Sequence, residues 1–198
     1  MARIIRASDC RTTPWKNGGG STTEIAIAPP GASLDDFDWR ISMARVASDG
    51  PFSEFSGIDR TLAIVKGHGL SLTIGDAEPV VVDRHSDPIP FPGDIPTSAR
   101  LLAGEVIDLN VMTRRGYFEH RLQRIRKAAR CDFEGYDIAL AVAGSGKVEL
   151  SLPRQKIDLG DDDAAILMRA DEGAFTIAPT GSADCYLVLL RSCRNHTG

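Results

Sequence analysis

LAIVKGHGLSLTI, residues 62–74, and LAVAGSGKVELSL, residues 140–152, share one pattern: a Gly-x-Gly turn between two apolar runs that look like strands. A shift of 77 residues places Gly67 on Gly144, and the match continues without gaps for nearly fifty residues. A pattern that recurs at a fixed distance over such a length indicates two halves with the same architecture.

Short alternating apolar segments, bounded by Gly, Pro, Asp and Ser, continue along the chain and are typical of strands. Under the same shift, the strand ending at Arg114 falls on the strand ending at Arg191. This order predicts an all-β protein of two fused antiparallel cupin-like (jelly-roll) β-barrels, a bicupin. We expect an N-terminal barrel with a ligand pocket over residues 1–120 and a C-terminal barrel with a filled core over residues 121–198. The basic segment 119–132, the best helical candidate, would mark the boundary.

Composition and charge narrow the class of protein. The chain has 198 residues, 42% of them apolar and 25% charged, so it can fold without a disulfide or metal. A net charge of −4, with acids and bases interspersed, argues against nucleic acid, and we interpret the basic segment as a solvated helical linker. Four cysteines without C-x-x-C spacing, and the lack of a signal-peptide core or membrane-length apolar run, predict a cytoplasmic protein that contacts no membrane.

Histidine spacing argues against a metal centre, which barrels of this class often hold on clustered histidines. The chain has His68, His85, His120 and His196, with no H-x-H pair. His68 lies between two glycines, and its repeat partner is a serine, so we expect an exposed turn residue. The sequence therefore predicts no metal and no cofactor.

The segment PWKNGGGSTTEIA, residues 14–26, runs three glycines directly into a strand. A phosphate-binding loop would lead into a helix and carry a Lys-Ser/Thr pair, and this segment does neither. Because side chains alternate along a strand, Glu24 lies on the face opposite Ile25. That face is either the lumen of a barrel or the solvent side of an edge strand, and the pattern leaves both open.

Polar side chains alternate with apolar ones on two further strands, WRISMARV at 39–46 and DLNVMTR at 108–114. Arg60 begins a third strand between them. Arginines, an asparagine and a serine on converging faces would form a receptor for a carboxylate, because the guanidinium fork binds carboxylate through two parallel hydrogen bonds. The alternative is that these are ordinary solvent faces. The equivalent strand of the second half, 185–190, is apolar on both faces, which favours a filled C-terminal barrel.

At these residues the chain resembles the HutD/Ves family of bicupin-like proteins over nearly its whole length. The resemblance is densest in five ordered blocks: WKNGGGSTTEI (15–25), WRISMA (39–44), GPFSEFSGIDR (50–60), GHG (67–69) and DLNVMTRR (108–115). Such proteins look like two stacked cupin barrels without the usual metal histidines. The HutD branch accompanies histidine-utilisation enzymes and tunes that pathway, and the Ves branch is linked to cold stress.

The resemblance implies a small anionic ligand, such as formylglutamate, formiminoglutamate or urocanate, whose binding modulates histidine utilisation. The alternative is a metal-independent isomerase or hydrolase acting on a small carboxylic acid, with Glu24 as general acid or base. We favour a binding protein because no second acid is evident beside Glu24. The sequence does not decide whether the protein forms a homodimer. Carried over by position, the ligand-binding residues would be Trp15, Asn17, Glu24, Arg40, Ser42, Arg60, Asn110, Met112 and Arg114.

Overall fold

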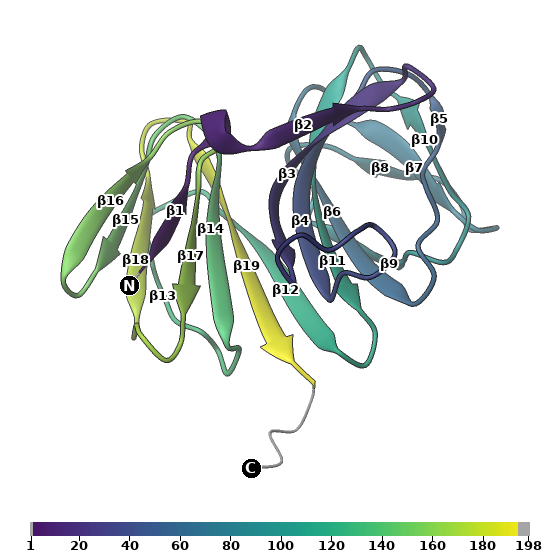
Figure 1. Ribbon diagram of the computed structural model, residues 1–198. Coiled ribbons are helices and arrows are strands. Elements are labelled where there is room, and N and C mark those ends of the chain that lie inside the picture. The colour runs from purple at the N-terminus through teal and green to yellow at the C-terminus, as the bar shows by residue number, and fades with distance from the viewer. Residues whose placement is uncertain (1, 194–198) are drawn as a thin grey trace. The chain divides into compact units, whose positions relative to one another are not determined.

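The computed structural model describes residues 2–193, and nearly all regular structure within them is strand. The one helical element among these residues is a 3-10 turn, η1 (Ala7–Asp9), and none of their helices is long and apolar enough to cross a membrane. The expectation of an all-β, antiparallel protein is confirmed. Figure 1 labels the strands in chain order.

The chain divides into two compact units. The first unit is Arg11–Tyr117, and the second unit combines the described residues 2–10 and 118–193. The first unit contains β2 (Arg11–Pro14), β3 (Gly20–Ala28), β4 (Trp39–Val46), β5 (Gly50–Pro51), β6 (Ile58–Lys66), β7 (Leu70–Ile74), β8 (Val80–Val82), β9 (Ile89–Pro92), β10 (Thr97–Leu101) and β11 (Val106–Arg114). The second contains β1 (Arg3–Ile5), β12 (Phe118–Ile125), β13 (Ala129–Cys131), β14 (Ile138–Ser145), β15 (Val148–Leu152), β16 (Gln155–Leu159), β17 (Ala164–Met168), β18 (Phe175–Pro179) and β19 (Asp184–Ser192).

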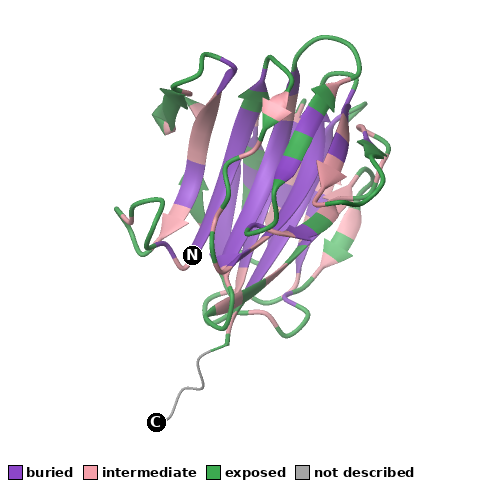
Figure 2. Ribbon diagram, turned by 90° about the vertical axis from the view of Figure 1, so that its right-hand side faces the viewer, coloured by how far each residue is buried: buried purple, intermediate pink, exposed green. Residues whose placement is uncertain are grey.

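Each unit is built from two antiparallel sheets. In the first unit the sheets have the orders β2-β3-β4-β11-β6-β9 and β5-β10-β7-β8, and in the second β1-β17-β14-β19-β12 and β13-β18-β15-β16. The long strands carry most of the buried residues, and the connecting loops are largely exposed (Figure 2). Apolar side chains from both sheets form the core of each unit, which is the arrangement that buries one face of every sheet.

The first unit's core defines which side chains point inward. Leu62 and Ile64 of β6 pack with Leu70 and Leu72 of β7 in one buried cluster. Because alternate residues of a strand share a face, and cross-strand partners lie on the same face, this cluster fixes the inner face of the larger sheet. In the second unit the closing strand β19 instead contributes Cys185, Leu187 and Leu189 to an apolar core.

The same order of strands occurs in both units. The strand β11 and its counterpart β19 begin and end 78 residues apart, from Val106 to Asp184 and from Arg114 to Ser192. The central strand β6 lies between β11 and β9, and β14 lies correspondingly between β19 and β17. The sequence shift of 77 residues therefore finds the matching strands, whose ends lie 78 residues apart.

The glycine turns correspond at an offset that differs from the 77 residues of the sequence shift. A Cβ on Gly67, whose φ is +95°, would lie 2.6 Å from the carbonyl oxygen of Glu105, just before β11. A Cβ on Gly146, whose φ is +71°, would lie 2.8 Å from Cβ of Ala183, just before β19. Gly146, and not Gly144, therefore takes the place of Gly67 in the second unit.

Two expectations about the boundary differ from the structure. The basic segment 119–132 is not helical: it forms β12 and β13, because β12 pairs along its length with β19, where Leu122 is buried opposite Val188. The first residues of the chain belong to the second unit and not to the barrel expected over residues 1–120. The cause is β1, which pairs with β17 from Arg3 opposite Ile166 to Ile5 opposite Ala164.

Candidate functional site

The inner face of the larger sheet in the first unit carries a row of polar side chains. Met112 of β11 lies between Arg40 of β4 and Arg60 of β6 as their direct cross-strand partner. In the next row, Asn110 lies opposite Ser42, which in turn lies opposite Glu24 of β3. Register thus places these six sequence-predicted residues on one face, directed into the unit instead of toward solvent.

Arg60 is the most enclosed of these groups, with 6% of its surface exposed. Its Nη2 donates to Oδ1 of Asn110 at 2.8 Å and its Nη1 donates to the carbonyl oxygen of Ser53 at 3.2 Å. Among the described residues its Nε has no partner. Burial lowers the pKa of Arg60 to about 10, and Arg40 adds to this while Asp108 opposes it, so the guanidinium stays charged at neutral pH.

Three phenylalanine rings surround the Arg60 guanidinium. Its carbon lies 5.5 Å from the ring centre of Phe52, 5.6 Å from that of Phe55 and 5.0 Å from that of Phe91. Aromatic faces attract a cation, and attraction of this kind is stronger when water is excluded. Phe52 and Phe55 come from the loop before β6, and Phe91 is the cross-strand partner of Arg60 on β9. These rings hold the guanidinium in one position.

Asp108 lies one row further along the same face of β11, opposite Ala44 and Ile64. Only 1% of it is exposed. Its Oδ1 accepts a hydrogen bond from Nδ2 of Asn110, and its Oδ2 has no partner among the described residues. Burial raises the pKa of this carboxyl to about 7, against the opposing effects of Arg60 and the Asn110 hydrogen bond.

Arg40 and Glu24 form an ion pair on the same inner face. Nε of Arg40 donates to Oε2 of Glu24 at 2.8 Å, with 10% of the Arg40 side chain and 36% of the Glu24 side chain exposed. The sequence left open whether Glu24 faces the lumen of a barrel or the solvent. In the structure it lies on the inner face, where its half-buried side chain pairs with Arg40. No hydrogen bond from Nη1 or Nη2 of Arg40 is present within residues 2–193, so these donors are available to a ligand.

The charges on this face do not cancel. Two guanidinium groups, Arg40 and Arg60, share it with one carboxylate, Glu24, and with Asp108, which exchanges a proton near neutral pH. Two buried positive charges with unused donors in a medium of low dielectric constant favour an anion. The arrangement can therefore bind and orient a small carboxylate or a similar oxyanion.

The other three sequence-predicted residues serve the surrounding structure. Nε1 of Trp15 donates to Oγ1 of Thr22 at 2.8 Å, and Oδ1 of Asn17 accepts from the amide of Gly19 at 3.0 Å within the glycine loop. Arg114 donates from Nε to the carbonyl oxygen of Phe37 and from Nη2 to that of Asp35, both at 2.9 Å. These side chains hold the loops at either end of the inner face.

Sequence reasoning did not single out Asp108 or the phenylalanine cage. Asp108 has the same parity on β11 as Asn110 and Met112, so alternation alone could have placed it on the inner face. The three rings could not have been assigned to Arg60, because Phe52 and Phe55 come from an irregular loop and Phe91 approaches through the pairing of β6 with β9.

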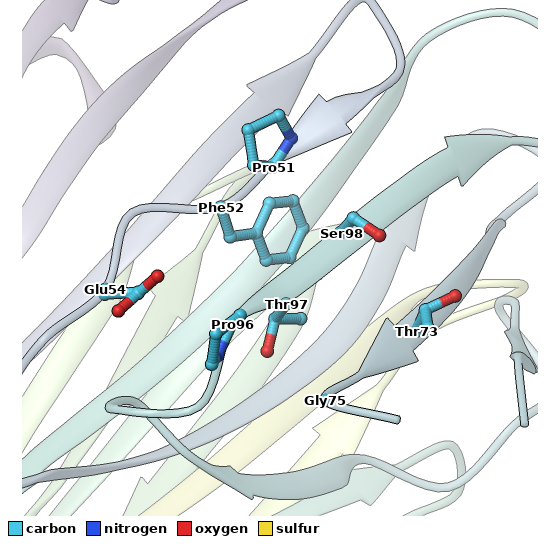
Figure 3. A pocket seen from close by; sticks show the side chains of 8 residues that line it. All are labelled: Pro51, Phe52, Glu54, Thr73, Gly75, Pro96, Thr97 and Ser98. Atoms are coloured by element: carbon cyan, nitrogen blue, oxygen red, sulfur yellow. The ribbon is translucent and has the colours of Figure 1, made fainter. Parts of the chain in front are cut away.

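A cavity of about 200 Å³ opens beside this site, at the end of the smaller sheet. It is lined by Pro51, Phe52, Glu54, Thr73, Gly75, Pro96, Thr97 and Ser98, which Figure 3 shows around the Phe52 ring. None of the sequence-predicted ligand residues lines it. Phe52 is the residue shared between this cavity and the cage around Arg60.

Within the described part of the chain, no group of three or more His, Cys, Asp or Glu side chains could hold a metal ion. His68 is exposed in the turn between β6 and β7, as expected, and His196 lies outside the described residues. The four cysteines are free thiols. Burial is the largest of the effects that raise the pKa of the Cys185 thiol.

Comparison with known proteins identifies the family. The HutD family model matches residues 7–185 of this chain. An uncharacterised 21.2 kDa protein from the hutC 3′ region of Pseudomonas putida is 33% identical over 171 residues, which cover 86% of this chain and 88% of that protein. The chain belongs to the HutD family. The protein Ves of Citrobacter koseri is 40% identical over 111 residues, 54% of this chain and 56% of Ves.

Solved structures agree with this membership of the HutD family. The structure of HutD from Pseudomonas fluorescens SBW25, obtained in a formate condition, superposes with a TM-score of 0.83 at 29% identity, covering 97% of this chain and 99% of that one. More distant structures, at 10% identity or less, have TM-scores of 0.69 and 0.63 and share the cupin-like fold alone.

Proposed function

We propose that this HutD-family protein binds a small carboxylate on Arg60 and Arg40 inside the first unit, and that occupancy of the site modulates histidine utilisation. The observation that carries the proposal is the inner face itself, where two buried guanidinium groups face one paired carboxylate, Glu24. A carboxylate ligand would restore the charge balance and would accept hydrogen bonds from donors that the described residues leave unused.

The surroundings of Arg60 favour a small, flat anion. Phe52, Phe55 and Phe91 leave the edges of the guanidinium as its polar surface, and planar carboxylates match those edges. The HutD structure from Pseudomonas fluorescens was obtained in a formate condition, and formate is the smallest such anion. A longer acid would place its remaining atoms toward the cavity beside Phe52.

Family membership suggests which acids to test. The matching family is HutD, and one relative comes from a hutC region, so acids of the histidine-utilisation pathway are the first candidates. Formylglutamate, formiminoglutamate and urocanate each carry a carboxylate together with a polar group. We propose a binding role without turnover, in which the bound acid reports the state of the pathway.

The test is calorimetric titration of formate, formylglutamate and urocanate into the wild-type protein and into Arg60→Ala, Arg60→Lys and Arg40→Ala. Removing a guanidinium that is bonded to a buried carboxylate should weaken binding by about 2 to 5 kcal/mol, and lysine should recover part of the loss because it keeps the charge without the planar fork. The matched control is Arg115→Ala, because Arg115 is a half-exposed arginine paired with Asp59 and Asp94. Equal affinity in all five proteins would reject the arginine receptor.

One observation favours the alternative of a metal-independent enzyme. Asp108 is a second acid on the same face as Glu24, and a carboxyl with a pKa of about 7 can give or take a proton at neutral pH. Its burial below Asn110 keeps it from the ligand position on Arg60 and Arg40, which is why we favour binding. Incubation of each acid with the protein, followed by chromatography of the products, distinguishes the two roles, since turnover that Glu24→Gln abolishes would establish an enzyme.

A further inference from the structure

The inner face ends in a buried carboxyl that the proposed ligand does not touch. Asp108 is connected to Arg60 through Asn110 alone: the amide nitrogen of Asn110 donates to Asp108, and its amide oxygen accepts from Arg60 at 2.8 Å. At each end of this series of hydrogen bonds one buried atom has no hydrogen-bond partner among the described residues: Oδ2 of Asp108 and Nε of Arg60. A buried network that is only partly satisfied responds strongly to a change of charge at either end.

Few other charges act on Asp108. Its neighbours on β4 and β6 are Ala44 and Ile64, and the opposite sheet contributes the apolar side chains Leu70, Leu72, Val82 and Ala99 to the core at this level. The charged groups on the same face are Arg60 of β6, Arg40 of β4, Glu24 of β3 and, on the exposed edge strand β2, Arg11. Arg60 is therefore the main positive charge that favours the ionised form of Asp108.

We propose that binding of a carboxylate at Arg60 is coupled to the uptake of one proton by Asp108. The inference rests on the proposed function and adds its regulation: the bound acid and the proton stabilise each other. The proton comes from the solvent and binds a carboxylate oxygen of Asp108, and no other bond changes.

The direction of the coupling follows from the sign of the charges. In the empty site Arg60 attracts the ionised form of Asp108 and partly offsets the effect of burial. A bound carboxylate neutralises that attraction and adds a negative charge nearby, so the pKa of Asp108 rises further and the side chain takes up a proton. By linkage, the affinity for the acid increases as the pH falls through about 7.

The experiment measures proton uptake directly. Formate and glutarate are titrated by calorimetry at about pH 7 into the wild-type protein, in two buffers of different ionisation enthalpy, and the difference in heat gives the protons taken up per bound acid. We expect roughly half a proton in the wild type, and an affinity roughly five- to tenfold higher near pH 6 than near pH 8. Binding with the same heat in both buffers would reject the coupling and leave the proposed function intact.

The decisive variant is Asp108→Asn, which keeps an acceptor for Asn110 and is neutral at every pH. It should bind formate without proton uptake, with an affinity that is the same at both pH values and close to that of the wild type near pH 6. Asp94→Asn is the control: Asp94 is a half-exposed carboxylate paired with Arg115, and its loss should leave the coupling unchanged. Proton uptake that persists in Asp108→Asn would overturn the inference.

A measurement on the wild type covers the case in which Asp108→Asn does not fold. Infrared difference spectra with and without formate at neutral pH should show a carboxylate band replaced by a band of a protonated carboxyl in an apolar environment. Its absence in a protein shown to bind formate would also reject the coupling. Failure of the wild type to bind formate or glutarate at either pH would reject the proposed function together with this inference.

Discussion

Nη1 of Arg6 donates a hydrogen bond to Oδ2 of Asp163 at 2.7 Å, across 157 positions of the chain. The same carboxylate accepts from the amides of Ala7 and Gly160, at 2.9 and 3.0 Å. One side chain thus fixes the end of the first strand, β1, to the loop before β17. Burial opposes ionisation of Asp163, but these three hydrogen bonds outweigh it and lower its pKa.

Asp163→Ala should lower the free energy of unfolding by about 1 to 3 kcal/mol, because two backbone amides lose their acceptor. The ion pair between Arg6 and Asp163 adds little to this loss of stability, because the Arg6 side chain is half-exposed. Since the pKa of Asp163 is lower in the folded state, its contribution is present above the unfolded pKa and is lost as the pH falls through the folded one. Urea unfolding at neutral and acidic pH measures both effects. Asp158→Ala, which removes an exposed carboxylate from β16, is the control.

Gly67→Ala should destabilise the first unit by about 2 kcal/mol or more, because the new Cβ would meet the backbone of Glu105 at 2.6 Å and would also strain a residue with positive φ. Gly104→Ala has a similar φ, +67°, but no atom lies within 4 Å of its added Cβ. It should therefore show the cost of the backbone conformation alone, about 1 kcal/mol. Thermal unfolding of the two variants gives the difference, and equal losses would contradict the steric account.

Arg114→Ala should affect stability more than it affects ligand binding. Arg114 holds the carbonyl oxygens of Asp35 and Phe37 and lies over the Phe37 ring at 5.8 Å, and Phe37 packs edge-on against Phe55. We expect a loss of about 1 to 2 kcal/mol in unfolding free energy and a smaller loss of carboxylate affinity than in Arg60→Ala. A loss of affinity equal to that of Arg60→Ala, in a folded variant, would place Arg114 in the receptor itself.

Chelators should leave the melting temperature unchanged. A structural metal contributes its binding free energy to folding, so its removal lowers stability by several kcal/mol. The part of the chain that the structure describes brings no suitable group of ligands together. Thermal unfolding with and without EDTA, together with elemental analysis of the purified protein, is the measurement. About one transition metal per chain would contradict this prediction.

Alternation of side chains was enough to predict the all-β fold and which polar residues of the first unit share a face, but it did not decide whether that face points inward or toward solvent. Arg40, Ser42 and Asn110 were placed from the period of a strand alone, and the register of β4, β11 and β6 confirms that they share a face. The reason is physical: a shift of one residue would turn every one of these side chains to the other side of the sheet.

Contacts that depend on distant partners were beyond the sequence. The segment 119–132 has the residues of a solvated helix, but pairing of β12 with β19 overrides that local preference. Nothing near Arg3 or Arg6 in the sequence indicates that their partners lie at β17 and Asp163. Arg114 was expected in the pocket, but in the structure it donates to loop carbonyl oxygens. The direction of its side chain at the end of β11 cannot be obtained from the strand pattern.

The position of β1 changes what a fragment of this protein can be. Because residues 2–10 complete the sheet of the second unit, the first unit is an insertion within the second, although both follow the same strand order. A single cleavage between Tyr117 and Phe118 leaves the carboxy-terminal piece with an exposed edge at β17, where backbone groups that β1 would bond are open to other chains. Separate expression of the second unit therefore calls for a circular permutant that joins Cys10 to Phe118, whereas residues 11–117 form a continuous segment.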